Sequence, residues 1–517
     1  MDDSVGAWLS RSLRVNASRI AIESDQGALT YGQLDAWSRV LQDQLEASGV
    51  RAGDTVALYT GNREEFLVGD VAIARMGAVR TPINELLPPA TVAHIVKHSD
   101  TRALLVGPQL AERAATALAE IGEDIPVWQA DDGVTPLLAG ATPLVRPAAG
   151  APATRHRAQQ VGPDELAALL YTGGTTGQPK GAAHSQRGWA AFHTAQLIEA
   201  EIRQQDRLLL MTPLAHAAGV FAQSAMLRGA TVMLRSGFDV EATLRAFRDE
   251  AVSWTFLVPT MIYRLLEAAG PNAAFPSVET IVYGAAPITP ARLSQALRVF
   301  GPVFIQLYGQ TECPNWGTRL VKTDHDDQRP ELLTSCGQAS TMAEVTVIDD
   351  EGDDVPVGEP GEVCLRAPYT LLRYHRDEQA SAAKFVGDRI RTGDIGVLDD
   401  AGYLYLKDRR ADMVITGGMN VYCKEVEDVL ATHPSVSSVA VIGIPHEDWG
   451  EAVHAVVVAG GPVQEDELLG WVRDRLAAYA RPKSVEFTDQ LPETPLGKID
   501  KRALRAHRWG ANARAIN

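Results

Sequence analysis

The sequence predicts an α/β protein. We expect a large N-terminal domain of layered, mostly parallel sheets with helices, and a small C-terminal α+β domain joined to it by a hinge. Two observations support this prediction: helix and strand signals alternate along the first part of the chain, and a separate pattern begins after the charged run at 407–412. The chain has 517 residues, which is too long for one ordinary compact domain.

The first third of the chain carries the alternation most clearly. Thr30 and Gln33 form a capping-box pair, which predicts a helix start, and apolar residues follow at helical spacing. Residues 56–59 are predicted to form a buried strand, and residues 64–76 a helix that ends at Gly77. Another strand follows. This rhythm implies crossover connections and a largely parallel sheet.

The later segments have a different composition. Residues 129–160 are rich in Ala, Pro, Gly and Thr and are predicted to be a surface linker. Residues 166–171 form an apolar strand that runs into a Gly/Thr loop, and residues 343–407 indicate short strands with turns. The last hundred or so residues are predicted to form helices at 424–431 and 465–479 and strands at 436–442, 453–459 and 484–488.

The net charge is -17 and the mean hydropathy is -0.08. The negative charge argues against nucleic acid or an anionic membrane as a general partner. No apolar run approaches the ~20 residues of a membrane helix, and the acidic N-terminus does not resemble a signal peptide. We therefore expect a cytoplasmic protein without stable membrane insertion. The four cysteines form no CxxC pair and are expected to be reduced thiols: Cys313, Cys336, Cys364 and Cys423.

The strongest local motif is YTGGTTGQPKG at 171–181. Its glycines allow consecutive backbone N–H groups to converge on an anion, its threonine hydroxyls add donors, and Lys180 adds a cation. It is not a Walker A loop, because Lys180 is followed by Gly181 rather than Ser or Thr. A flexible surface loop is the alternative that these residues alone leave open.

Residues 171–181 resemble the phosphate loop of the adenylate-forming superfamily, which includes acyl-CoA synthetases, luciferases and peptide-synthetase adenylation domains. The resemblance covers nearly the whole chain and implies an AMP-forming carboxylic acid–CoA ligase that uses ATP, Mg²⁺ and coenzyme A. Further motifs recur in the family's order: Leu29–Tyr31, Gly53–Asp54, Pro213–Gly219, Tyr283–Pro287, Tyr308–Glu312, Arg391–Gly396, Lys407–Asp412, Gly417–Glu427 and Pro495–Lys501.

The resemblance implies that several of these residues bind ATP or AMP. The aromatic ring of Tyr308 offers a stacking face for a purine, Thr311 can reach a phosphate, and Glu312 offers a hard oxygen ligand for Mg²⁺. Thr175 is a second candidate contact to magnesium. The remaining expected nucleotide-binding residues are Thr172, Gly173, Gly174, Thr176, Gly177, Lys180, Gly284, Ala285, Ala286, Pro287, Gly309, Asp394 and Arg409.

Lys498, in the motif PLGKID, resembles the family's late lysine of adenylation. A carboxylate that attacks the α-phosphate meets like charge, so a cation between the two stabilises the transition state. Lys498, Glu312 and Thr311 together form the expected catalytic set. Asp394 resembles the residue that accepts from both ribose hydroxyls, and Arg409 the arginine that assists at ribose and phosphate.

The acyl pocket is expected at His216, Gly284, Cys313 and Trp316. The segments around them are mostly small or apolar, which favours an apolar fatty, aryl or bulky alicyclic acid; a satisfied core histidine is the alternative for His216. Two further residues resemble the loop at the family's pantetheine tunnel, although a plain strand-to-helix turn would also use them: Gly417 and Gly418.

The sequence departs from the family at the hinge. Where relatives carry Asp or Lys, this chain has Ala411. The predicted division is therefore an ATP- and acyl-binding domain at 1–408, a hinge at 409–411 and a mobile domain at 412–517. Loss of a charged hinge side chain leaves open how the adenylating and thioester-forming conformations are balanced.

Other functions remain open on the sequence. One is an enzyme that performs mainly the thioester-forming half-reaction on a supplied acyl-adenylate; another is a non-catalytic acid or nucleotide sensor on the same fold; a third is an oxidative luciferase-like enzyme. Residues 212–222 contain no carboxylate that could pair with an amino-acid ammonium group, which argues against an amino-acid adenylation domain. A small-molecule acid is the expected partner, and a homodimer is left open.

Overall fold

The computed structural model describes residues 4–147, 158–172, 178–270, 273–410, 412–473, 475–493 and 499–509. The chain packs into two compact units, one made of Met1–Val345 with Leu365–Ile390 and the other of Thr346–Cys364 with Arg391–Asn517. Residues 391–408 thus pack with the C-terminal unit, whereas the sequence places the domain boundary after 408. The rotation expected about 409–411 stays a prediction.

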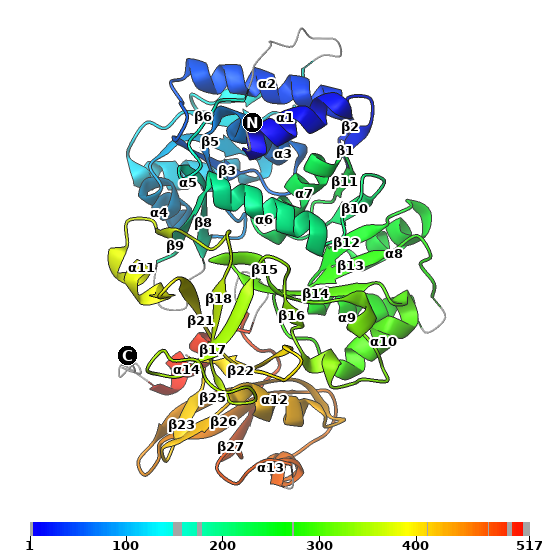
Figure 1. The fold of residues 1–517 in the computed structure, drawn as a ribbon, viewed down its shortest axis with the longest axis vertical. Helices are drawn as coiled ribbons and strands as arrows, with labels where there is room; N and C mark the ends of the chain where they lie inside the picture. The colour runs from blue at the N-terminus through cyan, green and yellow to red at the C-terminus, as the bar shows by residue number, and fades with distance from the viewer. Residues whose placement is uncertain are drawn as a thin grey trace. The chain divides into compact units, whose positions relative to one another are not determined.

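Two sheets build the first unit (Figure 1). In the larger sheet the pairs from β14 through β13, β12, β10 and β11 to β1 are all parallel, as the alternation of helix and strand predicts. Within the described residues its nine strands lie in the order β16 (Gln338–Ala339), β15 (Cys313–Leu320), β14 (Phe304–Gln310), β13 (Thr280–Tyr283), β12 (Trp254–Leu257), β10 (Arg207–Leu210), β11 (Thr231–Leu234), β1 (Ile20–Ser24) and β2 (Gly27–Thr30).

The second sheet is parallel from β8 to β7 and antiparallel where β9 joins β8 and β19 joins β9. Its eight strands in the described part of the chain are β19 (Arg373–Tyr374), β9 (Lys180–Ser185), β8 (Leu166–Thr172), β4 (Val79–Pro82), β3 (Thr55–Tyr59), β5 (Thr101–Val106), β6 (Val127–Ala130) and β7 (Thr142–Leu144). Strand β7 lies inside the predicted linker at 129–160 and β6 overlaps its first two residues, so part of that segment belongs to the sheet.

The helices of this unit follow the predicted signals. The capping box of Thr30 and Gln33 is present at the start of α2, and α3 ends at Gly77 in the left-handed conformation, φ 64°. The helices are α1 (Val5–Val15), α2 (Tyr31–Ala47), α3 (Glu64–Met76), α4 (Pro89–His98), α5 (Ala111–Ile121), α6 (Gln186–Glu199), α7 (Ala217–Arg228), α8 (Val240–Asp249), α9 (Pro259–Ala269), α10 (Pro290–Phe300) and α11 (Glu378–Lys384).

The chain from 344 to 409 forms the short strands that its turns predict: β17 (Glu344–Ile348), β18 (Gly361–Arg366), β20 (Phe385–Val386), β21 (Arg389–Leu398) and β22 (Leu404–Arg409). Farther along lie β23 (Val414–Thr416), β24 (Met419–Val421), α12 (Cys423–Ala431), β25 (Val436–His446), β26 (Gly450–Ala459), α13 (Glu465–Arg473), β27 (Ser484–Phe487) and α14 (Lys501–Trp509). These elements enclose a separate hydrophobic core.

The prediction of a helix at 465–479 is wrong at its C-terminal end. Helix α13 ends at Arg473, and the described residues 475–480 form turns and a bend. Leu476 and Ala480 are nevertheless buried in the core of this unit. Their apolar spacing is therefore satisfied by packing of a turn, which a periodicity argument cannot distinguish from another helical turn.

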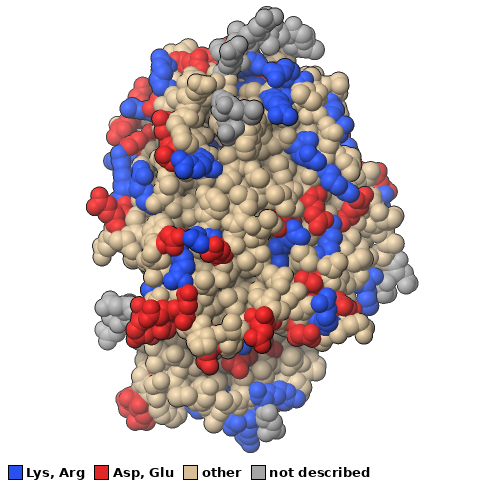
Figure 2. All heavy atoms as spheres, in the orientation of Figure 1, with Lys and Arg blue, Asp and Glu red and all other residues tan. Residues whose placement is uncertain are grey.

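Acidic and basic side chains are interspersed over the face shown in Figure 2. Elsewhere in the first unit, ion pairs join Arg207 to Glu23 at 2.7 Å and Arg203 to Asp206 at 2.8 Å. Among the described residues, no helix has the length and apolar composition needed to cross a membrane.

Candidate active site

Three family motifs of the first unit lie where parallel strands of the larger sheet end. The loop 284–287 follows β13. Residues 308–310 extend β14 beyond its parallel pairing with β13, which reaches only Gln306, and Thr311 and Glu312 form the turn that follows. His216 closes the loop after β10. In open α/β sheets ligands bind at the carboxyl ends of strands, so this edge is the candidate site.

Two glycines let the backbone segments of this edge approach one another. A Cβ atom on Gly284 would lie 2.6 Å from the carbonyl oxygen of Leu307, and one on Gly309 would lie 2.7 Å from the carbonyl carbon of Asn315. Any side chain at either position would separate the loop from its neighbouring strand. Ala285 has φ 66°, a left-handed conformation that costs energy for a residue with a Cβ atom.

Glu312 is buried, with 7% of its surface exposed. The hydroxyl of Tyr374 donates a short hydrogen bond to its Oε1, and the ammonium of Lys384 lies 3.7 Å from the same oxygen. Lys384 also donates to Oε1 of Gln310 at 2.8 Å. Burial, together with the Glu312 carboxylate, raises the pKa of Tyr374, so its proton stays on the phenol.

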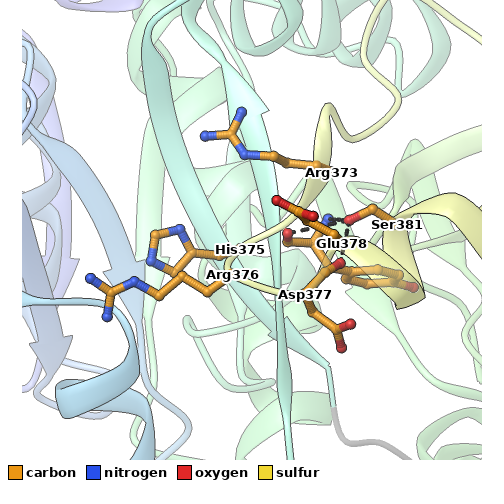
Figure 3. Close-up of a pocket in the computed structure, with 7 residues that line it drawn as sticks. Arg373, His375, Arg376, Asp377, Glu378 and Ser381 are labelled. Carbon is orange, nitrogen blue, oxygen red and sulfur yellow. Dashed lines mark hydrogen bonds between the residues drawn. The ribbon is translucent and has the colours of Figure 1, made fainter.

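Lys180, the cation at the end of the expected phosphate loop, also lies beside Tyr374. Its ammonium lies 5.5 Å from the ring centre of Tyr374 and 3.5 Å from Oδ2 of Asp377. Tyr374 and Asp377 also line a surface pocket of about 420 Å³ (Figure 3). Lys180, Tyr374, Glu312 and Lys384 therefore form one connected set of two cations, one phenol and one carboxylate.

Two hydrogen bonds hold the backbone of this motif. The ring of His184, in β9, donates from Nε2 to the carbonyl oxygen of Thr311 at 3.0 Å, and the N–H of Leu371 donates to the carbonyl oxygen of Glu312 at 2.7 Å. Burial lowers the pKa of His184 to about 4, so the ring is neutral at neutral pH. Thr311 and Glu312 are thus fixed to β9 and to the segment before β19.

His216 is exposed, which does not fit the alternative of a satisfied core histidine. Its Nε2 lies 2.9 Å from Nδ2 of Asn84. Because Oδ1 of Asn84 accepts from the N–H of Leu86, its Nδ2 is the donor and the ring carries its proton on Nδ1. Asn62 supports the same loop, since its Nδ2 donates to the carbonyl oxygen of Thr212 at 2.9 Å and its Oδ1 accepts from Leu214 N–H at 2.8 Å.

Aromatic rings pack beside these loops. The ring of Phe221 lies 4.9 Å from that of Trp254, 5.3 Å from that of Phe256 and 6.4 Å from that of Trp316, centre to centre. Burial raises the pKa of the Cys313 thiol to about 12, so it is uncharged. The surroundings of the expected acyl pocket are therefore apolar.

In the second unit, Asp394 and Arg409 are brought together. They are directly opposite one another on β21 and β22, with Nε of Arg409 3.4 Å from Oδ1 of Asp394. The N–H of Asp394 donates to the hydroxyl of Thr392 at 3.0 Å, and that hydroxyl donates to the carbonyl oxygen of Val363 at 2.7 Å. The ribose-binding pair expected from the sequence thus has a fixed strand geometry.

Gly417 and Gly418 both have positive φ, 57° and 80°. The N–H of Gly417 donates to the carbonyl oxygen of Trp449 at 2.9 Å. The indole of Trp449 is 40% exposed and stacks on the ring of His446 with centres 4.1 Å apart, while the ammonium of Lys483 lies 4.9 Å from its ring centre. An exposed aromatic surface with a cation therefore lies beside the glycine pair.

Known proteins resemble this chain over its whole length. The model of the AMP-binding enzyme family matches residues 9–375, and that of the AMP-binding enzyme C-terminal domain matches residues 425–498. The chain belongs to the AMP-binding enzyme family. The resemblance to acyl-CoA synthetases that its motifs indicate is thereby confirmed.

Curated relatives of this AMP-binding enzyme include two acid–CoA ligases. The medium/long-chain-fatty-acid–CoA ligase FadD8 of Mycobacterium tuberculosis is 36% identical over 94% of this chain and 87% of its own length. Feruloyl-CoA synthase of an Amycolatopsis species is 35% identical over 98% of this chain and 99% of its own.

Solved structures of similar proteins agree with the fold. The amide bond synthetase McbA from Marinactinospora thermotolerans superposes with a TM-score of 0.89 at 32% identity, covering 97% of this chain and 99% of that one. ATP-bound MatB from Rhodopseudomonas palustris superposes with a TM-score of 0.88 at 28% identity, covering 98% and 99%. A large N-terminal and a small C-terminal α/β domain are thus confirmed.

Several expected residues of this AMP-binding enzyme lie outside the described part of the chain: Gly173, Gly174, Thr175, Thr176, Gly177, Ala411 and Lys498. The strands that flank the phosphate loop are described, and Thr172 of β8 pairs with Lys180 of β9. The loop therefore starts and ends at neighbouring positions of an antiparallel pair.

The carboxylate of Glu312 could bind magnesium only together with ligands from water or from ATP. Within the described residues, no group of three or more His, Cys, Asp or Glu side chains could hold a metal ion. Mg²⁺ is commonly bound by one or two carboxylates together with waters and substrate phosphates. The single buried carboxylate of Glu312 fits a magnesium ion that enters with ATP.

Sequence reasoning missed four residues of this AMP-binding enzyme. Asn84, Tyr374 and Lys384 contact His216 or Glu312, and Asn62 supports the loop that carries His216, yet none of the four lies in a family motif. Asn62 and Asn84 follow β3 and β4 closely, so polar residues just beyond parallel strands could have indicated them. Tyr374 and Lys384 carry no comparable signal in the sequence.

Proposed function

We propose that this protein joins a carboxylic acid to coenzyme A in two steps. The carboxylate first attacks the α-phosphate of ATP, giving an acyl-adenylate and pyrophosphate. The thiol of coenzyme A then attacks the acyl carbon, giving acyl-CoA and AMP. The observation that carries this proposal is the meeting of two adenylate motifs: Lys180 of the phosphate-loop motif lies 5.5 Å from the ring centre of Tyr374, and Tyr374 donates a hydrogen bond to Glu312.

In the first step Tyr308 stacks on adenine, while Asp394 and Arg409 bind the ribose. Lys180 and the preceding glycines and threonines bind the phosphates, and Lys498 stabilises the charge that gathers as the carboxylate attacks. Magnesium, bound through Glu312, would neutralise phosphate charge. Tyr374 holds the Glu312 carboxylate by its hydroxyl, and His184 holds the backbone at Thr311.

In the second step the pantetheine arm passes Gly417 and Gly418, whose missing side chains leave room beside the backbone. Trp449 and Lys483, next to these glycines, offer a stacking surface and a positive charge to the nucleotide end of coenzyme A. His216 borders the acyl group, with its Nε2 occupied by Asn84. Alternation of the two units about 409–411 remains part of the proposal.

The substrate is an apolar fatty, aryl or bulky alicyclic acid. Phe221, Trp254, Phe256 and Trp316 pack together as a buried aromatic cluster, in which Trp316 is the residue expected to border the acyl group, and the Cys313 thiol is uncharged. A second carboxylate would be buried without a partner in such surroundings, which is costly. The names of two relatives, a fatty-acid–CoA ligase and a feruloyl-CoA synthase, support the same class.

A panel of carboxylic acids, each incubated with ATP and Mg²⁺ with and without coenzyme A, tests the proposal. We expect acid-dependent pyrophosphate exchange without coenzyme A, and AMP release with acyl-CoA formation when coenzyme A is added. Thioester formation only from supplied acyl-adenylate would support the half-reaction alternative, and absence of both activities would support a binding protein. A cytoplasmic location and a homodimer are further proposals, which fractionation and light scattering test.

A further inference from the structure

A chain of buried polar side chains runs between α6 and α7 of the first unit, which Figure 1 shows side by side. It begins at an ion pair in which Nε of Arg80 lies 2.6 Å from Oδ1 of Asp70. The guanidinium of Arg80 lies 5.3 Å from the ring centre of Trp189. Asp70 and Arg80 are 0% and 3% exposed, so the chain starts at a fixed, desolvated pair.

The next links have defined directions. Oε1 of Gln223 accepts from Nε1 of Trp189 at 3.0 Å and from Nε2 of His193 at 2.5 Å. Burial lowers the pKa of His193 to about 3, so the ring is neutral and its proton is on Nε2. Nδ1 of His193 must then accept from the hydroxyl of Ser224, 2.7 Å away.

The chain ends at Gln196. Its Nε2 donates to Oγ of Ser224 at 2.9 Å and to the carbonyl oxygen of Val220 at 2.8 Å. These two acceptors determine the orientation of the amide. Its Oε1 therefore faces the other way and accepts from Nδ2 of Asn315 at 2.7 Å and from the indole Nε1 of Trp316 at 3.3 Å.

Asn315 and Trp316 lie in β15, directly after the turn that contains Glu312. Asn315 has φ 57° and lies where the pairing of β14 and β15 shifts register. This left-handed backbone conformation costs energy, so the hydrogen bond from the Asn315 side chain to Gln196 helps to hold it. Trp316 is fully buried. Without the oxygen of Gln196, the buried indole N–H of Trp316 and the half-buried amide of Asn315 would lose an acceptor, which favours a rearrangement of this segment.

We propose that Gln196 is a positioning residue that determines acid specificity, because it fixes the Asn315–Trp316 wall of the acyl pocket. This inference rests on the proposed function, in which Trp316 borders the acyl group. Gln196 itself does not touch the reacting atoms. Ser224, His193 and Gln223 act behind it by keeping the amide in one orientation.

The test compares Gln196→Leu, which removes the acceptor at similar volume, with Gln186→Leu. Gln186 begins the same helix, is also buried and donates to the carbonyl oxygen of Leu166 at 3.1 Å, so it controls for loss of a buried amide from α6. The readout is the ratio of kcat/KM for a bulky aryl acid to that for a straight-chain acid. We expect Gln196→Leu to change this ratio about tenfold and to leave KM for ATP unchanged, whereas Gln186→Leu should leave both unchanged.

Ser224→Ala is the second variant, because it removes a bond that orients Gln196 without changing the pocket wall. It should shift the ratio in the same direction by a smaller factor, and it serves where Gln196→Leu does not fold. An unchanged ratio in a folded variant, while the wild type shows acid-dependent pyrophosphate exchange, would overturn this inference alone. A wild type without such exchange for any acid would overturn the proposed function and this inference together.

Discussion

Tyr374 donates a hydrogen bond from its hydroxyl to Oε1 of Glu312, the carboxylate proposed to bind magnesium. The phenol keeps its proton because burial raises its pKa. A donor behind a metal ligand fixes the direction of the carboxylate, and loss of such a partner commonly costs 10–100-fold in metal affinity or activity. The contact therefore predicts how Tyr374 influences magnesium dependence.

Tyr374→Phe should raise the magnesium concentration needed for half-maximal pyrophosphate exchange by roughly tenfold. The ring, and hence its contact with Lys180, is retained. Tyr405→Phe is a suitable control, because its hydroxyl donates to Asp399 at 3.3 Å, another tyrosine–carboxylate bond in the second unit. An unchanged magnesium requirement in Tyr374→Phe would show that this hydrogen bond does not orient the metal ligand.

Glu312→Gln should have a stronger effect than Tyr374→Phe, since an amide oxygen is a poorer ligand for a hard cation than a carboxylate. We expect adenylation to fall at limiting magnesium and to recover in part at high magnesium. Exchange rates measured across a magnesium titration check this. Full activity of Glu312→Gln at low magnesium would contradict the assignment of Glu312 as a ligand.

Three buried histidines of the first unit predict that the free energy of unfolding decreases in acid. Burial lowers the pKa of His184 to about 4, of His193 to about 3 and of His325 to about 4, from an ordinary value of 6.5. Between these values and 6.5 the unfolded chain binds more protons than the folded one. Their contribution to stability is therefore complete above pH 6.5 and falls as the pH drops, by about 1.4 kcal/mol per histidine and pH unit.

The variant His184→Gln removes the contribution of one of these histidines to the pH dependence of stability. A glutamine can still donate to the carbonyl oxygen of Thr311 but does not titrate. The difference in Tm between pH 7.5 and pH 5 should therefore be smaller than in the wild type. His446→Gln, which changes a half-buried histidine of the second unit, is the comparison. The same acid-induced drop in Tm for His184→Gln and wild type would mean that folding does not lower the pKa of His184.

Lys498→Ala should abolish formation of the acyl-adenylate but spare thioester formation from supplied acyl-adenylate, because the positive charge is needed only where the carboxylate meets the α-phosphate. Removing one preorganised charge of this kind costs about 10²–10³ in rate. The two half-reactions are assayed separately. Equal loss of both in a folded variant would show that Lys498 is not specific to adenylation.

Ala411→Pro should impair one half-reaction far more than the other. Proline fixes φ near about -65° and disfavours the α conformation at Arg410, which should trap one of the two proposed conformations. Ala411→Asp restores a charged side chain and should be the milder change. If Ala411→Pro performs both half-reactions at wild-type rates, the proposed rotation does not pivot at this residue.

Much of the local structure could be predicted from the sequence. The capping box at Thr30 and the left-handed Gly77 after α3 are both present, because caps and turns depend on residues a few positions apart. The motif order also determined the family, which the family models matching residues 9–375 and 425–498 confirm. The helix predicted at 465–479 ends early, because burial of Leu476 and Ala480 produces the same apolar spacing without a helix.

Only the tertiary structure decided which distant side chains support the motifs. Tyr374 meets Glu312 across 62 positions, Gln196 meets Asn315 across 119, and Asn84 meets His216 across 132. No local pattern marks such partners, since they meet through the order of strands in the two sheets and the packing of α6 on α7. The sequence by itself determined the chemistry this protein carries, whereas the fold decided which buried hydrogen bonds hold that chemistry in place, because these bonds form only between segments that folding brings together.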